Sequence, residues 1–164
     1  MGFPGRRQGF FLISAACAGA MGFALYSQYA LGLEPCPLCI FQRVGVIVVG
    51  LVALIAGLAN PGRTGFRIGA VLVSLAAIAG GSVSLRQLWL QHLPADMVPA
   101  CGPGLDYMLQ TMPFSRMFRK VFEGSGECAV VDWTFLGMAM PFWVLVFFVM
   151  VLMFVIVLWR RHGR

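Results

Sequence analysis

The amino-acid sequence predicts an all-α membrane protein, a bundle of four transmembrane helices, and three observations support this fold class. Of the 164 residues, 60% are hydrophobic and 11% are charged, and a soluble domain of this size cannot bury so much apolar surface. Four intervals carry no charge, and each can supply the roughly 20 apolar residues of a spanning helix: residues 8–33, 44–62, 68–85 and 133–159. The alternating polarity typical of a membrane β-barrel is absent from the sequence.

The four spans are expected within one integral membrane domain, residues 1–164, at about 9–29, 37–59, 68–89 and 140–159. The first span is rich in Ala and Gly, which let helices approach closely in lipid. Asn60, Pro61 and Gly62 are turn residues and end the second span. Two loops, about 30–36 and 90–139, then lie on one side of the membrane, and both termini lie on the other.

The distribution of charge predicts which side is which. Basic residues without acidic neighbours flank the termini and the turn between the second and third spans: Arg6, Arg7, Arg63, Arg67, Arg160, Arg161 and Arg164. All six acidic residues fall in the other two loops. Because cytoplasmic loops of membrane proteins are rich in Lys and Arg, we expect both termini in the cytoplasm and both acidic loops on the opposite side of the membrane. These clusters also explain the net charge of +6, so no nucleic-acid partner is expected.

The second acidic loop is expected to contain a short amphipathic interfacial helix at residues 113–122. Its apolar side chains recur at helical spacing, with basic side chains opposite: Phe114, Met117, Phe118, Val121 and Phe122 against Arg116, Arg119 and Lys120. Basic amphipathic helices of this kind lie in the headgroup layer of a membrane. Packing on the outer rim of the bundle is the alternative.

A pair of cysteines at the start of the second span is typical of a redox site. If Cys36 is the N-cap and Pro37 the first helical residue, both Cys36 and Cys39 lie on the first helical turn. Unpaired N–H groups and the helix dipole favour a thiolate there. Arg43 follows Cys39 by four residues and shares its helical face. We therefore expect a dithiol or disulfide and a fixed cation together at the membrane boundary.

Two further cysteines, Cys101 and Cys128, bracket the long loop. They form either a stapling disulfide, worth roughly 3 kcal/mol in the chain-entropy model, or a second redox pair. A zinc site is disfavoured because this pair lacks the short spacing of a zinc knuckle, and haem attachment is excluded because Ile40 stands where a histidine is required. No metal is therefore expected. Cys17, inside the first span, is expected to be a buried bystander.

Thiol–disulfide exchange between two such pairs moves electrons from one pair to the other but requires a final acceptor. Quinones dissolve in the membrane and can serve as that acceptor. Arg43 either donates to a quinone oxygen, stabilises the adjacent thiolate or simply snorkels to the interface. His92, at the outer end of the third span, either contacts the quinone and relays a proton or is an ordinary interfacial histidine beside Trp89. Arg86 and Gln87 are expected to be interhelical polar contacts.

These motifs resemble those of the DsbB family over nearly the whole chain: the run from Cys36 to Arg43, the loop pair Cys101 and Cys128, and Asp132–Gly137 before Met140-Pro141. The resemblance implies a thiol:quinone oxidoreductase of the bacterial inner membrane that reoxidises a periplasmic thioredoxin-like DsbA-type protein. It also implies a role for each cysteine. Cys101 would form the mixed disulfide with the partner, Cys128 would pair transiently with Cys36, and Cys39 would face a ubiquinone or menaquinone.

The resemblance further implies that Arg43 tunes the Cys39 thiolate and that His92 matches a family histidine near the quinone. Two alternatives stay open on the sequence. One is a DsbB paralogue, or a relative of vitamin K epoxide reductase, with a different dedicated partner. The other is a four-span scaffold with two structural disulfides. A membrane reductant sending electrons outward would need a cytoplasmic donor dithiol, and the predicted topology places no cysteine on that side.

Overall fold

The computed structural model describes residues 5–59, 62–94, 96–98, 107, 110–113, 115, 116, 119, 126–131 and 133–162. Two predictions therefore fall outside it in whole or in large part. Cys101 lies outside the described residues, and so do all five apolar residues of the predicted interfacial helix at 113–122.

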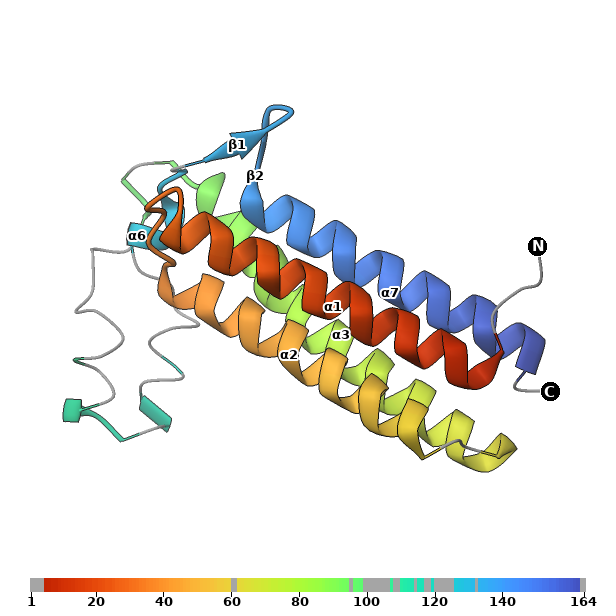
Figure 1. Cartoon of the computed structure of the whole chain (residues 1–164). Helices are drawn as coiled ribbons and strands as arrows, with labels where there is room; N and C mark the ends of the chain where they lie inside the picture. Colours follow the sequence, from red (N-terminus) through yellow and green to blue (C-terminus); the bar gives the residue numbers. More distant parts are fainter. Residues whose placement is uncertain are drawn as a thin grey trace.

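Four long helices make up most of the described chain: α1 (Arg6–Tyr29), α2 (Pro37–Leu58), α3 (Arg63–Gln91) and α7 (Met140–His162). Each is long and apolar enough to cross a membrane. A helix suits this environment because all its backbone hydrogen bonds are satisfied within the helix. The predicted fold class, an all-α multi-pass membrane protein, is confirmed. Figure 1 shows the four helices running alongside one another as a bundle, with both termini at the same end.

The helices pack in chain order, with α1 against α2, α2 against α3 and α3 against α7, whereas α1 and α7 contact each other much less. The shared core is apolar and includes Phe10, Val49, Phe66 and Phe148. Small residues bring the helices close together, as membrane helices require. Gly50 of α2, for example, lies so near α1 that an added Cβ would stand 2.9 Å from the Cβ of Cys17.

The end of the bundle opposite the termini carries three short elements: α6 (Gly126–Ala129), β1 (Thr134–Phe135) and β2 (Met138–Ala139) (Figure 1). The two strands pair antiparallel around a turn in which Leu136 and Gly137 adopt positive φ angles of 52° and 77°. No pattern in the sequence predicted this hairpin. A second buried cluster joins α6 to the ends of α2 and α3, and it consists of Leu38, Val83, Leu90 and Cys128.

Candidate active site

The Cys36–Cys39 pair forms a dithiol at the N-terminus of α2. Cys36 is the N-cap, Pro37 is the first helical residue, and the Cys39 backbone N–H donates to the Cys36 Sγ atom at 3.4 Å. The Cys36 thiol donates to the Cys39 Sγ atom at 3.0 Å, and both residues are half-buried. The predicted cap is thus present, because proline costs no hydrogen bond at this position.

Cys128 lies against this dithiol. It sits on α6, only 1% exposed, and packs with Leu38 and with the half-buried Cys36. Hydrogen bonds from Cys36 to Cys128 and then to Cys39, together with burial, raise the pKa of Cys36 well above its ordinary range. Three of the four cysteines predicted to be catalytic therefore meet in space, and the fourth, Cys101, is outside the described residues.

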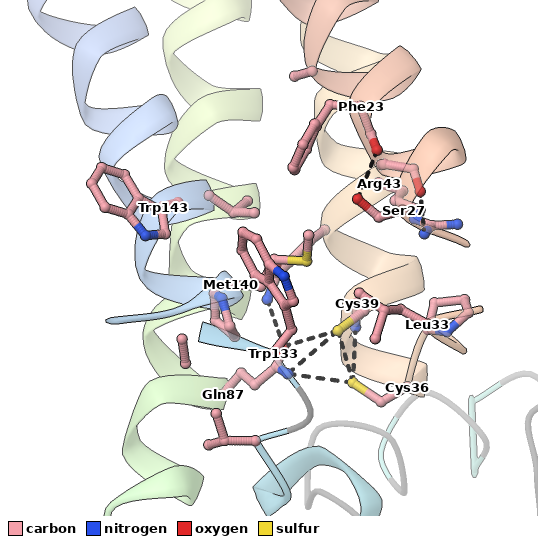
Figure 2. Close-up of a pocket in the computed structure, with 18 of the residues that line it drawn as sticks. Phe23, Ser27, Leu33, Cys36, Cys39, Arg43, Gln87, Trp133, Met140 and Trp143 are labelled. Atoms are coloured by element: carbon pink, nitrogen blue, oxygen red, sulfur yellow. Dashed lines mark hydrogen bonds between the residues drawn. The ribbon is translucent and has the colours of Figure 1, made fainter. Parts of the chain in front are cut away.

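Gln87 of α3 touches both sulfurs of the dithiol. Its side chain is 3% exposed, and its Nε2 lies 3.3 Å from the Cys36 Sγ and 3.4 Å from the Cys39 Sγ. Gln42 donates to the Gln87 Oε1 at 2.7 Å. Gln87 is thus an interhelical contact, as expected, but it is also a hydrogen-bond donor to the reactive sulfurs, which the sequence analysis missed (Figure 2). The available signal was a polar residue facing the bundle interior of a membrane helix, which is costly unless it has a role.

Arg43 reaches toward α1. One guanidinium nitrogen donates to the Ala24 carbonyl oxygen at 3.1 Å, and the other donates to the side-chain oxygen of Gln28. Arg43 also lines the same cavity as Cys39. It is therefore held between α2 and α1 rather than extended into solvent, and among the described contacts it makes none with a sulfur.

His92 does not join this group. It caps the C-terminus of α3, is exposed, and its Nδ1 lies 2.7 Å from the Leu88 carbonyl oxygen. The cavity is lined at this level by Gln87 and Gln91 of α3 instead. The geometry therefore places His92 at the surface, on the same end of the bundle but outside the site.

An apolar cavity of about 500 Å³ lies beside the dithiol. Its wall is formed by α1, α2, α3, the start of α7 and the β1–β2 hairpin, and it includes Phe23, Cys39, Trp133 and Trp143 (Figure 2). The Trp133 and Phe135 rings stack with centroids 6.0 Å apart, and Phe135 meets Trp143 edge to face. A mostly apolar cavity of this size, with a few polar groups at one wall, is typical of a small-molecule or cofactor site.

This cavity fits a quinone ring. The Gln87 amide and the Arg43 guanidinium provide N–H donors at its wall, and aromatic side chains provide flat apolar surfaces. No group of three or more His, Cys, Asp or Glu side chains with metal-binding geometry occurs among the described residues. The N–H donors and the flat aromatic surfaces of this cavity suit an uncharged, apolar ring compound.

The fold and the site together define a class of protein: a helical membrane oxidoreductase whose reactive dithiol faces an apolar cavity. Comparison with known proteins narrows this class. Residues 6–158 match the family model described as Disulfide bond formation protein DsbB. The chain belongs to the DsbB family, and it is accordingly a quinone-dependent protein-disulfide oxidoreductase.

Individual relatives agree over nearly full length. The chain is 58% identical to Disulfide bond formation protein B of Chromobacterium violaceum, over 96% of this chain and 95% of that protein. It is 45% identical to the protein of that name from Methylococcus capsulatus, over 100% of both chains. It is 46% identical to Disulfide bond formation protein B 1 of Pseudomonas aeruginosa, over 96% of each. These matches do not favour the scaffold alternative.

Proposed function

We propose that the chain resides in the bacterial inner membrane, reoxidises a periplasmic DsbA-type protein through Cys101 and Cys128, and passes the electrons through Cys36 and Cys39 to a quinone in the cavity. The observation that carries this proposal is the row of sulfurs from Cys128 to Cys36 to Cys39, which ends at the cavity. Each neighbouring pair in this row is in hydrogen-bond contact.

The cysteine steps balance as three thiol–disulfide exchanges. A partner thiolate attacks Cys101 of an oxidised Cys101–Cys128 pair and releases the Cys128 sulfur as a thiolate. Cys128 then attacks Cys36, the Cys36–Cys39 bond breaks, and Cys39 leaves as a thiolate. The second thiol of the partner resolves its mixed disulfide with Cys101. The partner has then lost two electrons. The chain holds them as one broken disulfide: Cys128 and Cys36 are bonded, and Cys101 and Cys39 are thiols, with Cys39 at the cavity wall.

The site's own residues prepare Cys39 for this role. The raised pKa of Cys36 keeps a proton on that sulfur in the reduced pair, while Gln87 donates to the Cys39 sulfur. A bound quinone supplies the final acceptor and takes up two electrons and two protons. Arg43 and Gln87 would hold its oxygens, and the aromatic wall around Trp133 and Trp143 would flank its ring and exclude water.

The proposed orientation places both termini in the cytoplasm and the cysteines at the periplasmic face. Its support is the distribution of charge. The end of the bundle away from the dithiol (Figure 1) carries four arginines at helix ends: Arg6 of α1, Arg63 of α3, and Arg160 and Arg161 of α7. Cytoplasmic enrichment in arginine is the general rule for such proteins. Thiol labelling of Cys36 in intact cells and in inverted membrane vesicles tests this orientation.

The proposed reaction is tested by mixing the purified protein with a reduced DsbA-type partner and either ubiquinone or menaquinone. We expect one quinone molecule to be reduced for each partner disulfide formed. The two kcat/KM values show which quinone is preferred. A Cys39→Ser variant should abolish quinone reduction. If the wild-type protein with intact thiols reduces neither quinone, the proposed function is wrong. If it reduces quinone only with thioredoxin-like proteins unrelated to DsbA, the dedicated-partner alternative holds.

A further inference from the structure

Gln42 and Gln87 form a buried amide pair between α2 and α3. Each side chain is 3% exposed, and the Gln42 Nε2 donates to the Gln87 Oε1 at 2.7 Å. Gln87 in turn presents its own Nε2 to the sulfurs of Cys36 and Cys39. The order of groups is therefore Gln42 amide, Gln87 amide, dithiol, and only the second amide touches the sulfurs.

A primary amide has a donor end and an acceptor end, and its partners decide which end faces which neighbour. The Gln87 oxygen has two donors near it: Gln42 at 2.7 Å and the Cys39 thiol at 3.6 Å. The shorter bond from Gln42 fixes the oxygen toward Gln42 and away from the sulfurs. The Gln87 NH₂ group is consequently directed at the sulfurs, where it serves a thiolate better than a thiol, because a thiolate only accepts hydrogen bonds. Donation to the oxygen also polarises the amide and strengthens its NH₂ group as a donor.

We propose that Gln42 is a positioning residue for the reaction: acting through Gln87, it favours the reduced, negatively charged state of the Cys36–Cys39 pair and thereby makes this disulfide a stronger oxidant. Stabilising the reduced form of a dithiol raises its reduction potential. The partner of this enzyme is a strong oxidant in its own right, so the pair that accepts its electrons benefits from a high potential. The importance of this effect for turnover rests on the proposed function, but the effect itself is a property of the dithiol alone.

The alternative role for Gln42 is structural. Polar side chains bonded across helices help membrane helices associate, and loss of the Gln42–Gln87 pair would then loosen the contact between α2 and α3. A structural role predicts lower thermal stability with an unchanged reduction potential. Measuring both quantities separates the two roles.

The experiment uses the full-length protein in quinone-free detergent with Cys101→Ser and Cys128→Ser, so that Cys36–Cys39 is the one couple titrated. The fraction oxidised is measured by alkylation and mass spectrometry in glutathione buffers of defined potential. Gln42→Met, which keeps length but removes the hydrogen bond, should shift the equilibrium five- to tenfold toward the disulfide, where tenfold corresponds to about 30 mV. Ser84→Ala, which removes a buried hydroxyl of α3 bonded to the Gly80 carbonyl oxygen, should leave the potential unchanged.

A double-substitution cycle tests whether Gln42 acts through Gln87. Gln87→Met should lower the potential at least as much as Gln42→Met, and the double variant should be no lower than Gln87→Met alone. Additive shifts, or an unchanged potential in Gln42→Met, would overturn the proposal. If Gln42→Met does not fold, Gln42→Asn, whose shorter arm does not reach Gln87, takes its place. Failure of both to fold would assign Gln42 a structural role and also overturn it.

The cycle is independent of the proposed function. A wild-type protein that reduces no quinone would contradict the proposed reaction while leaving the measured potentials valid. Conversely, active quinone reduction with equal potentials in all variants would contradict the role of Gln42 alone.

Discussion

Cys128 on α6 is in hydrogen-bond contact with Cys36 at the N-cap of α2, although the two residues lie in different loops of the chain. The contact is buried by Leu38 and Leu90, which hold α6 against the ends of α2 and α3. A sulfur of the long loop between α3 and α7 is therefore already beside the dithiol that faces the cavity. Thiol–disulfide exchange between Cys128 and Cys36 therefore needs little motion.

The contact with Cys128 should control the titration of Cys36. Because Cys128 is the largest cause of the raised pKa of Cys36, Cys128→Ala should move that pKa down toward the ordinary cysteine value of roughly 8.5. The measurement is the midpoint of the pH–rate profile for alkylation of Cys36 in the reduced protein, resolved by peptide mass spectrometry. Cys17→Ala, in α1 beside Gly50 of α2, should not move the midpoint. A midpoint that is unchanged in Cys128→Ala would show that the contact is not made in the membrane protein.

Arg43→Met should weaken use of the quinone. The substitution removes a charged N–H donor from the cavity wall and releases the tether to Ala24 and Gln28, and hydrogen bonds of charged groups contribute about 1.5–3 kcal/mol. We expect the KM for quinone to rise roughly 10- to 100-fold, with Arg43→Lys intermediate because lysine lacks the planar fork of donors. Arg86→Met, whose guanidinium lies over Trp89, serves as the matched loss of charge. Equal KM values for the Arg43 and Arg86 variants would remove Arg43 from the quinone site.

Gly80→Ala should destabilise the bundle. An added Cβ at Gly80 would overlap the ring of Phe148, which is buried in the contact between α3 and α7. Overpacking of this kind costs about 1–3 kcal/mol, so the thermal unfolding midpoint in detergent should fall. Gly22→Ala provides the control, because nothing lies within 4 Å of the added Cβ there. If both variants unfold at the wild-type temperature, the packing of α3 on α7 is not as tight as the structure shows.

Cys101→Ala should separate the two halves of the reaction. Without Cys101 the loop disulfide that the partner is proposed to attack cannot form, so partner oxidation should fall to background. The Cys36–Cys39 pair, reduced chemically, should still pass electrons to quinone at the wild-type rate. The two half-reactions are measured separately by partner thiol loss and by quinone absorbance. Cys17→Ser should leave both intact, and partner oxidation at a normal rate in Cys101→Ala would assign the partner's attack to another cysteine.

The fold class was predictable because lipid imposes a simple rule on sequence: each span must be apolar over its whole length. The ends of the helices follow a different rule. α1 and α3 begin at Arg6 and Arg63, ahead of the charge-free intervals, because a helix continues past the hydrocarbon core as long as its hydrogen bonds do. The β1–β2 hairpin was not predictable in the same way, since its strands are only two residues long and carry no alternating pattern.

The dithiol was predictable because it is local: the cap at Cys36, the proline that follows it and Cys39 lie within one helical turn. The contacts of Gln87 and Cys128 depend instead on how α3 is rotated against α2 and on the path of a long loop, which no short stretch of sequence encodes. For the same reason, the sequence did not reveal the direction of the His92 side chain. His92 lies at the end of α3, as expected, but its ring is at the surface beside the Leu88 carbonyl oxygen. Gln87, not His92, faces the sulfurs.

The central claim is that Cys128 attacks Cys36 and that electrons then leave the protein from Cys39, at the cavity. It is tested most directly by mixing the oxidised wild-type protein with a reduced DsbA-type partner that retains only its attacking cysteine, and mapping all disulfides after rapid alkylation. We expect a disulfide between the partner and Cys101, a second between Cys128 and Cys36, and an alkylated Cys39. A mixed disulfide at Cys101 with the Cys36–Cys39 bond still intact and Cys128 alkylated would contradict the account.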